Sequence, residues 1–129
     1  MSWANAYVGL PAGADAAGLP CWHLVRRVYR EVLGIELPHY AGGQVCELER
    51  AELDRLITDA AASDWVESPQ PAAFDVLLFR RARYRCHVGV AVDTRRMLHM
   101  PETGACIVDI TQPRWAPRFL GAWTYRRAT

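Results

Sequence analysis

Three side chains of this sequence could together perform nucleophilic chemistry on a carbonyl group: Cys21, His87 and His99. Cysteine attacks as its thiolate, and a neighbouring histidine can take the thiol proton and later return it to a leaving amine. A second histidine can hold the first in the required tautomer and orientation. Each of the three, taken alone, is more often a buried structural residue. The interpretation therefore depends on the elements that carry them.

Cys21 opens a predicted amphipathic helix within the segment Leu19 to Leu37. Pro20 suits the first helical position, because its missing N–H would be unpaired there in any case. Gly34 is a typical residue for ending the helix. A thiol at a helix start lies among unpaired backbone N–H groups at the positive end of the helix dipole, and both favour the thiolate. Apolar residues at spacings of three and four form the predicted buried stripe: Cys21, Leu24, Val25, Val28 and Val32.

The two histidines lie twelve residues apart in strand-like segments, His87 in HVGVAV and His99 in MLHM. A tight connection around residues 93–96 predicts a hairpin. Side chains alternate between the two faces of a strand, so an odd-numbered connection places both histidines on one face, opposite or diagonal. We predict the odd connection. The backbone N–H of Cys21 and a neighbouring group would then bind the oxyanion. His23, off the helical face, and His39, in a loop, are predicted to have no catalytic role.

The rest of the chain predicts one α+β domain over residues 1–129, with helices first and an antiparallel sheet afterwards. A leading loop (1–18) precedes a helical half (19–66), which includes a turn from Pro38 to Gly43 and a second helix over residues 47–62. The Ser-Pro-Gln-Pro segment at 68–71 separates this half from a sheet half (72–126). Five strands are predicted there, at residues 74–79, 86–92, 97–100, 105–110 and 119–125.

Composition excludes several classes of function. The net charge of +1 gives no global field toward nucleic acid or an anionic membrane, and all fifteen basic residues are arginine, which removes lysine-based Schiff-base chemistry. The arginine clusters at 26–30 and 80–85 are interpreted as solvated faces. The four cysteines form no CxxC pair, so neither a disulfide nor a zinc site is expected, and Cys86 and Cys106 are predicted to be buried thiols. The N-terminus lacks the pattern of a secretory signal and no stretch reaches membrane-spanning length, so synthesis in a cytoplasm is expected.

Three ordered blocks of sequence resemble the NlpC/P60 family of papain-like cell-wall peptidases, and in particular its phage-tail branch. The first is G-L-P-C-W-H-L-V-R-R-V-Y-R-E-V-L-G-I-E-L-P at 18–38. The second is F-D-V-L-L-F-R at 74–80, and the third comprises H-V-G-V-A-V at 87–92 and M-L-H at 97–99. The likeness spans about residues 7–125. It implies a papain-like fold in which N-terminal helices, one of them opened by the catalytic cysteine, pack on a C-terminal antiparallel sheet of about five strands.

The resemblance also implies an activity. It identifies Cys21, His87 and His99 as nucleophile, base and third polar residue of a peptidase that cleaves peptidoglycan stem peptides, commonly at the γ-D-glutamyl–diaminopimelate bond. Trp22 and Tyr7 become candidates for contacting the substrate. No cofactor, metal, nucleic acid or membrane is implied. A phage-tail member would be made in the host cytoplasm, would assemble with other tail-tip proteins in the virion, and would open the wall locally during genome delivery.

Three departures from the family pattern leave alternatives open. Pro20 replaces the usual aspartate before the cysteine, and His23 replaces a small residue two positions after it. Many members also carry a tyrosine about a dozen residues before the cysteine; Tyr7 lies somewhat too far upstream, and Ala12 occupies the equivalent place. One alternative is a catalytically weak or inactive structural tail-tip protein on the same fold. A further alternative is a cysteine amidase toxin that acts on a different amide.

Overall fold

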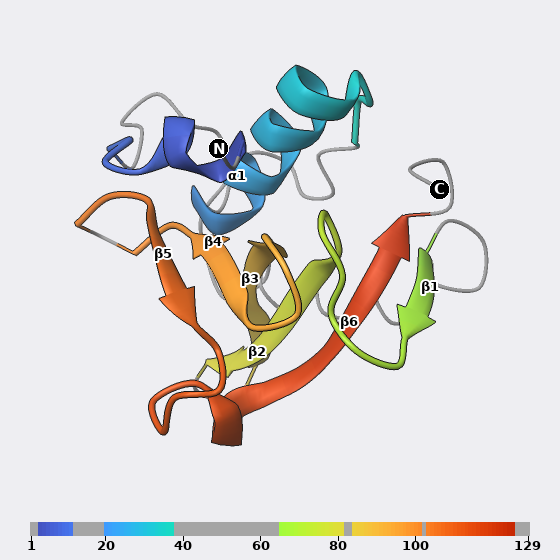
Figure 1. Cartoon of the computed structure of the whole chain (residues 1–129), viewed down its shortest axis with the longest axis vertical. Helices are drawn as coiled ribbons and strands as arrows, with labels where there is room; N and C mark the ends of the chain where they lie inside the picture. Colours follow the sequence, from blue (N-terminus) through green and yellow to red (C-terminus); the bar gives the residue numbers. More distant parts are fainter. Residues whose placement is uncertain (1–2, 12–19, 38–64, 82–83, 102, 126–129) are drawn as a thin grey trace.

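The computed structural model describes residues 3–11, 20–37, 65–81, 84–101 and 103–125, with the backbone alone at residues 20–21, 81 and 84–86. One α-helix, three short helical turns and six strands make up this part of the chain (Figure 1). In chain order they are η1 (Trp3–Tyr7), α1 (Pro20–Val28), η2 (Tyr29–Leu33), β1 (Trp65–Ser68), β2 (Val76–Arg81), β3 (Tyr84–Ala91), β4 (Arg96–His99), β5 (Cys106–Asp109), η3 (Ala116–Arg118) and β6 (Phe119–Tyr125).

The six strands form one antiparallel sheet in the order β1-β6-β2-β3-β4-β5. The predicted α+β class is therefore confirmed. All five predicted strands are present, four with shifted ends and β6 with the predicted ends. The sheet has one strand more than expected, because β1 begins at the end of the segment assigned to the helical half and continues into the separating segment, where no strand was predicted. This short strand pairs with β6, where Trp65 is opposite Tyr125 and Ser68 Oγ lies 2.7 Å from Thr124 Oγ1. A partner so distant along the chain leaves no local hairpin pattern.

The helix begins at Pro20, as predicted, but its last turn is wider than that of an α-helix. After Val28 the chain continues as the π-helical turn η2, and Gly34 ends it in the left-handed conformation with φ of 70°, its N–H donating to Tyr29 O. A π-turn holds an extra residue, so the buried face shifts by one position. Tyr29 is fully buried, whereas Val32 is 39% exposed, and the prediction that Val32 completes the buried stripe is wrong.

Two apolar cores cover the two faces of the sheet. In the first core, helix residues such as Leu24 and Val28 pack against alternate strand residues such as Leu78 and Val90. Figure 1 shows η1, α1 and η2 together on one side of the strands. The second core, on the opposite face, comprises Leu77, Phe79, Ala91, Met97, Ile110, Trp115 and Ala122. The β5–β6 connection supplies Trp115, so this segment covers the face of the sheet opposite to α1.

The connection between β3 and β4 has the odd length that the sequence predicts. Val92 N donates to Arg96 O at 2.9 Å, leaving three residues, 93–95, in the turn. The Asp93 carboxylate accepts hydrogen bonds from the backbone N–H groups of Arg95 and Arg96, which fixes the turn. The register that follows places Ala91 opposite Met97 and Val90 opposite Leu98.

Residues 3–11, the described part of the predicted leading loop (1–18), include a short helical turn. This turn is η1, and after it Gly9 N donates to Ala105 O while Ala105 N donates to Leu10 O, both at 2.8 Å. These bonds attach the segment to the chain just before β5. The predicted turn from Pro38 to Gly43, the second helix over 47–62, His39 and Cys46 lie outside the described residues. Within the described residues, no helix has the length and apolar character needed to cross a membrane.

Gly89 allows β3 and β4 to approach closely enough for the histidine-bearing strands to pair. A Cβ atom at this position would overlap the Met97 sulfur and lie 2.9 Å from Leu98 O. We expect Gly89→Ala to lower the free energy of unfolding by about 1–3 kcal/mol, because the backbone oxygen cannot move without separating the strands. Urea denaturation measures the change. Thr94→Ala, in the exposed turn, is the control; equal stability of the two variants would contradict the close approach.

Candidate active site

A direct hydrogen bond joins the two predicted catalytic histidines. His87 Nε2 lies 3.0 Å from His99 Nδ1, and each side chain is 4% exposed. The register explains the contact, since Val90 pairs with Leu98 and the two histidines therefore lie diagonally on one face. The expectation that they share a face is met. Their catalytic roles are not tested by this geometry and remain a prediction.

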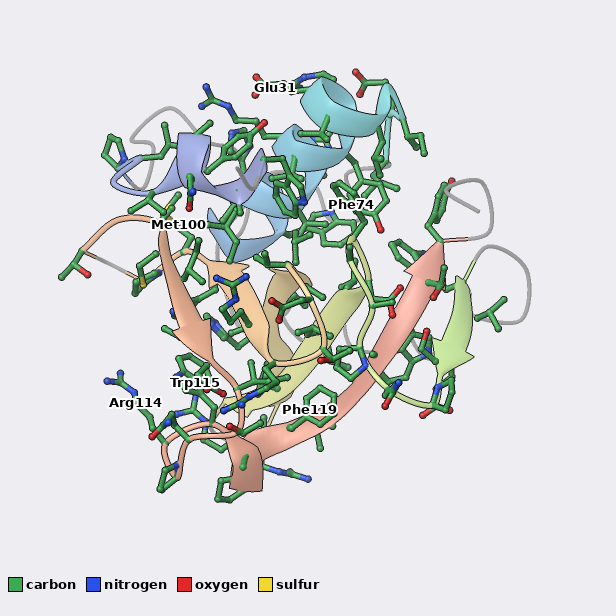
Figure 2. The ribbon with its side chains drawn as sticks, viewed as in Figure 1. Glu31, Phe74, Met100, Arg114, Trp115 and Phe119 are labelled. Carbon is green, nitrogen blue, oxygen red and sulfur yellow. The ribbon has the colours of Figure 1, made fainter. Side chains whose placement is uncertain are left out.

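Trp115 shields the histidine pair from solvent. Its ring stacks on His87 with a centroid distance of 5.7 Å and an interplanar angle of 24°, and meets His99 edge-on at 4.7 Å. The indole is 6% exposed and packs edge-on against Phe79, which is opposite His87 in the sheet. Figure 2 shows Trp115 beside Arg114, near the end of β5. Sequence reasoning missed this residue; a tryptophan within the turn-rich Gln-Pro-Arg-Trp-Ala-Pro segment was the available signal.

His99 is held in its neutral form. Burial, followed by the positive charges of Arg114 and Arg118, lowers the pKa of His99 from 6.5 to about 4. Both guanidinium groups also lie over the Trp115 ring, at 5.8 and 5.1 Å from its centroid. At neutral pH, His99 therefore carries one ring proton, and Nδ1 can accept a bond from His87 Nε2–H only if that proton is on Nε2.

Cys106 lies at the far side of His99. Its sulfur is 3.5 Å from His99 Nε2, and the residue is half-buried. The prediction of a buried thiol is therefore wrong for Cys106, because β5 is the edge strand of the sheet. The contact extends the line of polar groups to three, from His87 through His99 to Cys106. Within the described residues, no three histidine, cysteine or acidic side chains are arranged to hold a metal ion.

Cys21 is the second residue of α1, and this helix packs against β3, the strand that carries His87. Its side chain lies outside what the structure describes, so a contact between the thiol and His87 stays a prediction. The histidine pair lies on the Trp115 face of the sheet, whereas the apolar stripe of α1 packs on the other. Along β3, His87 lies three residues before Val90, on the side of the strand's start at Tyr84.

Trp22 and Tyr7 are core residues in this structure. Trp22 is 2% exposed, with its ring centroid 6.5 Å from that of Trp65. Tyr7 is 8% exposed and donates a 2.8 Å hydrogen bond to Glu31; burial and this bond raise the pKa of Tyr7 to about 12. Packing accounts for both side chains, and a contact of either with substrate remains a prediction. His23 is half-buried in α1.

The sequence pattern of the NlpC/P60 family matches residues 10–124, which is most of the chain and includes the helix, all six strands and the histidine pair. The chain belongs to the NlpC/P60 family. A solved structure agrees with this fold: a protein titled as similar to lipoprotein, NLP/P60 family, from Staphylococcus aureus Mu50. The TM-score is 0.62 at 22% identity, over 95% of this chain and 38% of that one.

Curated relatives of this NlpC/P60 domain include proteins named murein DD-endopeptidase MepS/murein LD-carboxypeptidase. The identity is 24% over 108 residues both for the Escherichia coli K12 protein and for the O157:H7 protein. These alignments cover 83% of this chain and 50% of each relative. The chain thus spans half the length of the curated relatives it matches.

Neutral His99 makes stability depend on pH in a defined window. Its folded pKa of about 4 is below the ordinary 6.5, so between these values the unfolded chain binds a proton that the folded chain does not. This contribution to stability is complete above pH 6.5 and is lost as the pH falls toward 4, by at most about 1.4 kcal/mol per pH unit. Urea denaturation of wild type and His99→Gln isolates it. The stability difference between them should shrink on acidification; a constant difference would contradict the assignment.

Proposed function

We propose that this chain is a cysteine peptidase that hydrolyses amide bonds in the stem peptides of peptidoglycan. The observation that carries the proposal is the buried 3.0 Å bond between His87 and His99, formed at the two positions that the family resemblance assigns to base and orienting residue. The murein activity in the names of the curated relatives supports the substrate class.

The bond to His99 defines which nitrogen of His87 acts as the base. Nε2 faces His99, so the proton of the Cys21 thiol passes to Nδ1. The helix α1, which carries Cys21, packs against β3, the strand that carries His87. The position of Cys21 in the first turn adds the helix dipole, which favours its thiolate.

The reaction follows from these positions. The Cys21 thiolate attacks the amide carbonyl, and the backbone N–H of Cys21 stabilises the developing oxyanion. The C–N bond then breaks, and the leaving amine takes the proton from His87, which leaves a thioester on Cys21. His87 next removes a proton from water, which attacks the thioester. The products are a carboxylate and the restored thiol, while His99 keeps His87 oriented throughout.

The bond we propose is γ-D-glutamyl–diaminopimelate, on the strength of the family resemblance. Pro20 stands where members that bind the stem peptide usually carry aspartate, so this chain lacks a carboxylate at that position. The stem peptide would then need a different contact at this position. The mass of the released fragments identifies the bond.

Digestion of purified peptidoglycan tests the proposal directly. Wild type should release new stem-peptide fragments detectable by mass spectrometry, whereas Cys21→Ala should lower their yield by at least about 10³-fold, because no other group supplies the nucleophile. Cys46→Ala, at a cysteine with no proposed role, is the matched control. Circular dichroism shows whether the wild type is folded. A folded wild type that releases no fragments would contradict the peptidase assignment.

The departures at Pro20 and His23 favour a second candidate, a structural tail-tip protein that has lost activity. Thiol reactivity separates the two. In an active enzyme, Cys21 should react with iodoacetamide at pH 6 at least about tenfold faster than a small-molecule thiol, because helix start and base both favour the thiolate. Peptide mass spectrometry reads each cysteine separately, and Cys106 serves as the internal comparison. Ordinary reactivity at Cys21 would favour the structural protein.

We further propose that the enzyme works at a phage tail tip, together with other tail proteins. The likeness of residues 18–38 to phage-tail members supports this setting. A tail-mounted enzyme would open the wall locally during genome delivery. Mass spectrometry of purified virions tests the proposal, because the polypeptide should be found with the other tail proteins. The genes beside the coding sequence give a second test: tail genes would support this setting, whereas immunity genes would favour a toxin.

A further inference from the structure

The thiol of Cys106 contacts the histidine pair at the end opposite to His87, and neither the reaction nor the family resemblance gives it a role. The sulfur lies 3.5 Å from His99 Nε2, and the same imidazole bonds His87 through Nδ1 at 3.0 Å. His99 is thus bonded at both ring nitrogens. What its second partner accepts or donates decides which tautomer His99 adopts.

We propose that Cys106 is a positioning residue: its sulfur accepts the Nε2–H of His99, which leaves His99 Nδ1 to accept the bond from His87. The inference rests on the proposed function, since it assigns the group that keeps His87 ready to act as base. Cys106 touches neither the nucleophile nor the substrate in this assignment. It acts through His99.

Two proton arrangements are possible along the line of polar groups, and only one supports catalysis. In the first, His99 Nε2–H points to the Cys106 sulfur and His87 Nε2–H points to His99 Nδ1, so His87 Nδ1 has the lone pair that takes a thiol proton. In the second, the Cys106 thiol donates to His99 Nε2 and His99 Nδ1–H donates to His87 Nε2. His87 then carries its proton on Nδ1 and cannot act as base there.

The groups around His99 keep its imidazole neutral, but neutrality alone does not determine which of the two tautomers it adopts. It is packed against His87 from β3, Cys106 from β5 and Trp115 from the β5–β6 connection, and the charged groups of Arg114 and Arg118 lie over the Trp115 ring. Burial and the two charges lower the pKa of His99 to about 4. A neutral imidazole has one proton for two nitrogens, so the atom facing Nε2 determines whether the proton is on Nε2 or on Nδ1.

Sulfur suits this role because a thiol is a weak donor. Its S–H competes poorly with the imidazole N–H, so the arrangement in which sulfur accepts is favoured. The position on the edge strand also leaves Cys106 half-buried, so its own S–H can turn toward solvent. A valine at this site would have similar size but no atom that accepts a hydrogen bond, and serine would keep one.

The first test reads the tautomer of His99 and does not depend on any enzymatic activity. Long-range ¹H–¹⁵N correlation spectra at pH 7.5 should show His99 protonated at Nε2 in wild type and in Cys106→Ser, and a mixture of tautomers in Cys106→Val. Ile107→Val, the next residue of β5, which packs in the first core, is the matched control and should match wild type. Cys106→Ala repeats the measurement if valine prevents folding. Wild-type His99 protonated at Nδ1, or an unchanged tautomer in both Cys106→Val and Cys106→Ala, would overturn the proposal.

The second test measures hydrolysis of a soluble stem-peptide substrate. Cys106→Val should lower kcat on the order of tenfold with KM unchanged, as a lost orienting contact does, and Cys106→Ser should restore most of it. Equal kcat in wild type and Cys106→Val, or a loss that serine does not restore, would overturn the proposal. If wild type cleaves nothing, the proposed function fails while the tautomer spectra still decide the role of Cys106.

Discussion

The hydrogen bond between His87 and His99 is the constraint on which the rest of the site depends. A bond of 3.0 Å between two diagonal side chains forms only in one register of β3 and β4. A shift by one residue would move one ring to the other face of the sheet. The three-residue turn held by Asp93 and the close approach allowed at Gly89 both maintain that register. Features distant from any reacting atom therefore determine whether the histidines meet.

The second core gives this bond its chemical character. Trp115 covers the pair, and the guanidinium groups of Arg114 and Arg118, which lie over its ring, act on His99 through space. Protonation of His99 is thereby opposed both by desolvation and by like charge. A neutral imidazole at His99 is the result. An aspartate in its place would attract a proton by charge. In the proposed role, a neutral His99 would orient His87 only through its tautomer, so the group at its other ring nitrogen matters.

The helix and the histidines approach the proposed reaction from different parts of the architecture. The apolar stripe of α1 is held by the first core, where its π-turn buries Tyr29 and its end is closed by Gly34. The histidine pair is held by the second core, on the opposite face. Two separate packing arrangements thus hold α1, which carries the proposed nucleophile, and the histidine pair.

The sequence by itself determined the features governed by local rules: a helix starting at Pro20 and ending at Gly34, an alternating strand pattern, and an odd turn that places His87 and His99 on one face. These follow from backbone sterics and side-chain periodicity within about a dozen residues. Only the tertiary structure decided that β1 joins β6, that Trp115 covers the histidines, and that Cys106 meets His99. Each depends on partners that the sheet order brings together, and no local period records which strand becomes the neighbour of another. The exposure of Val32 was likewise decided by the tertiary structure. The π-turn adds a residue to the helix, and Tyr29 is buried where the regular spacing would have buried Val32.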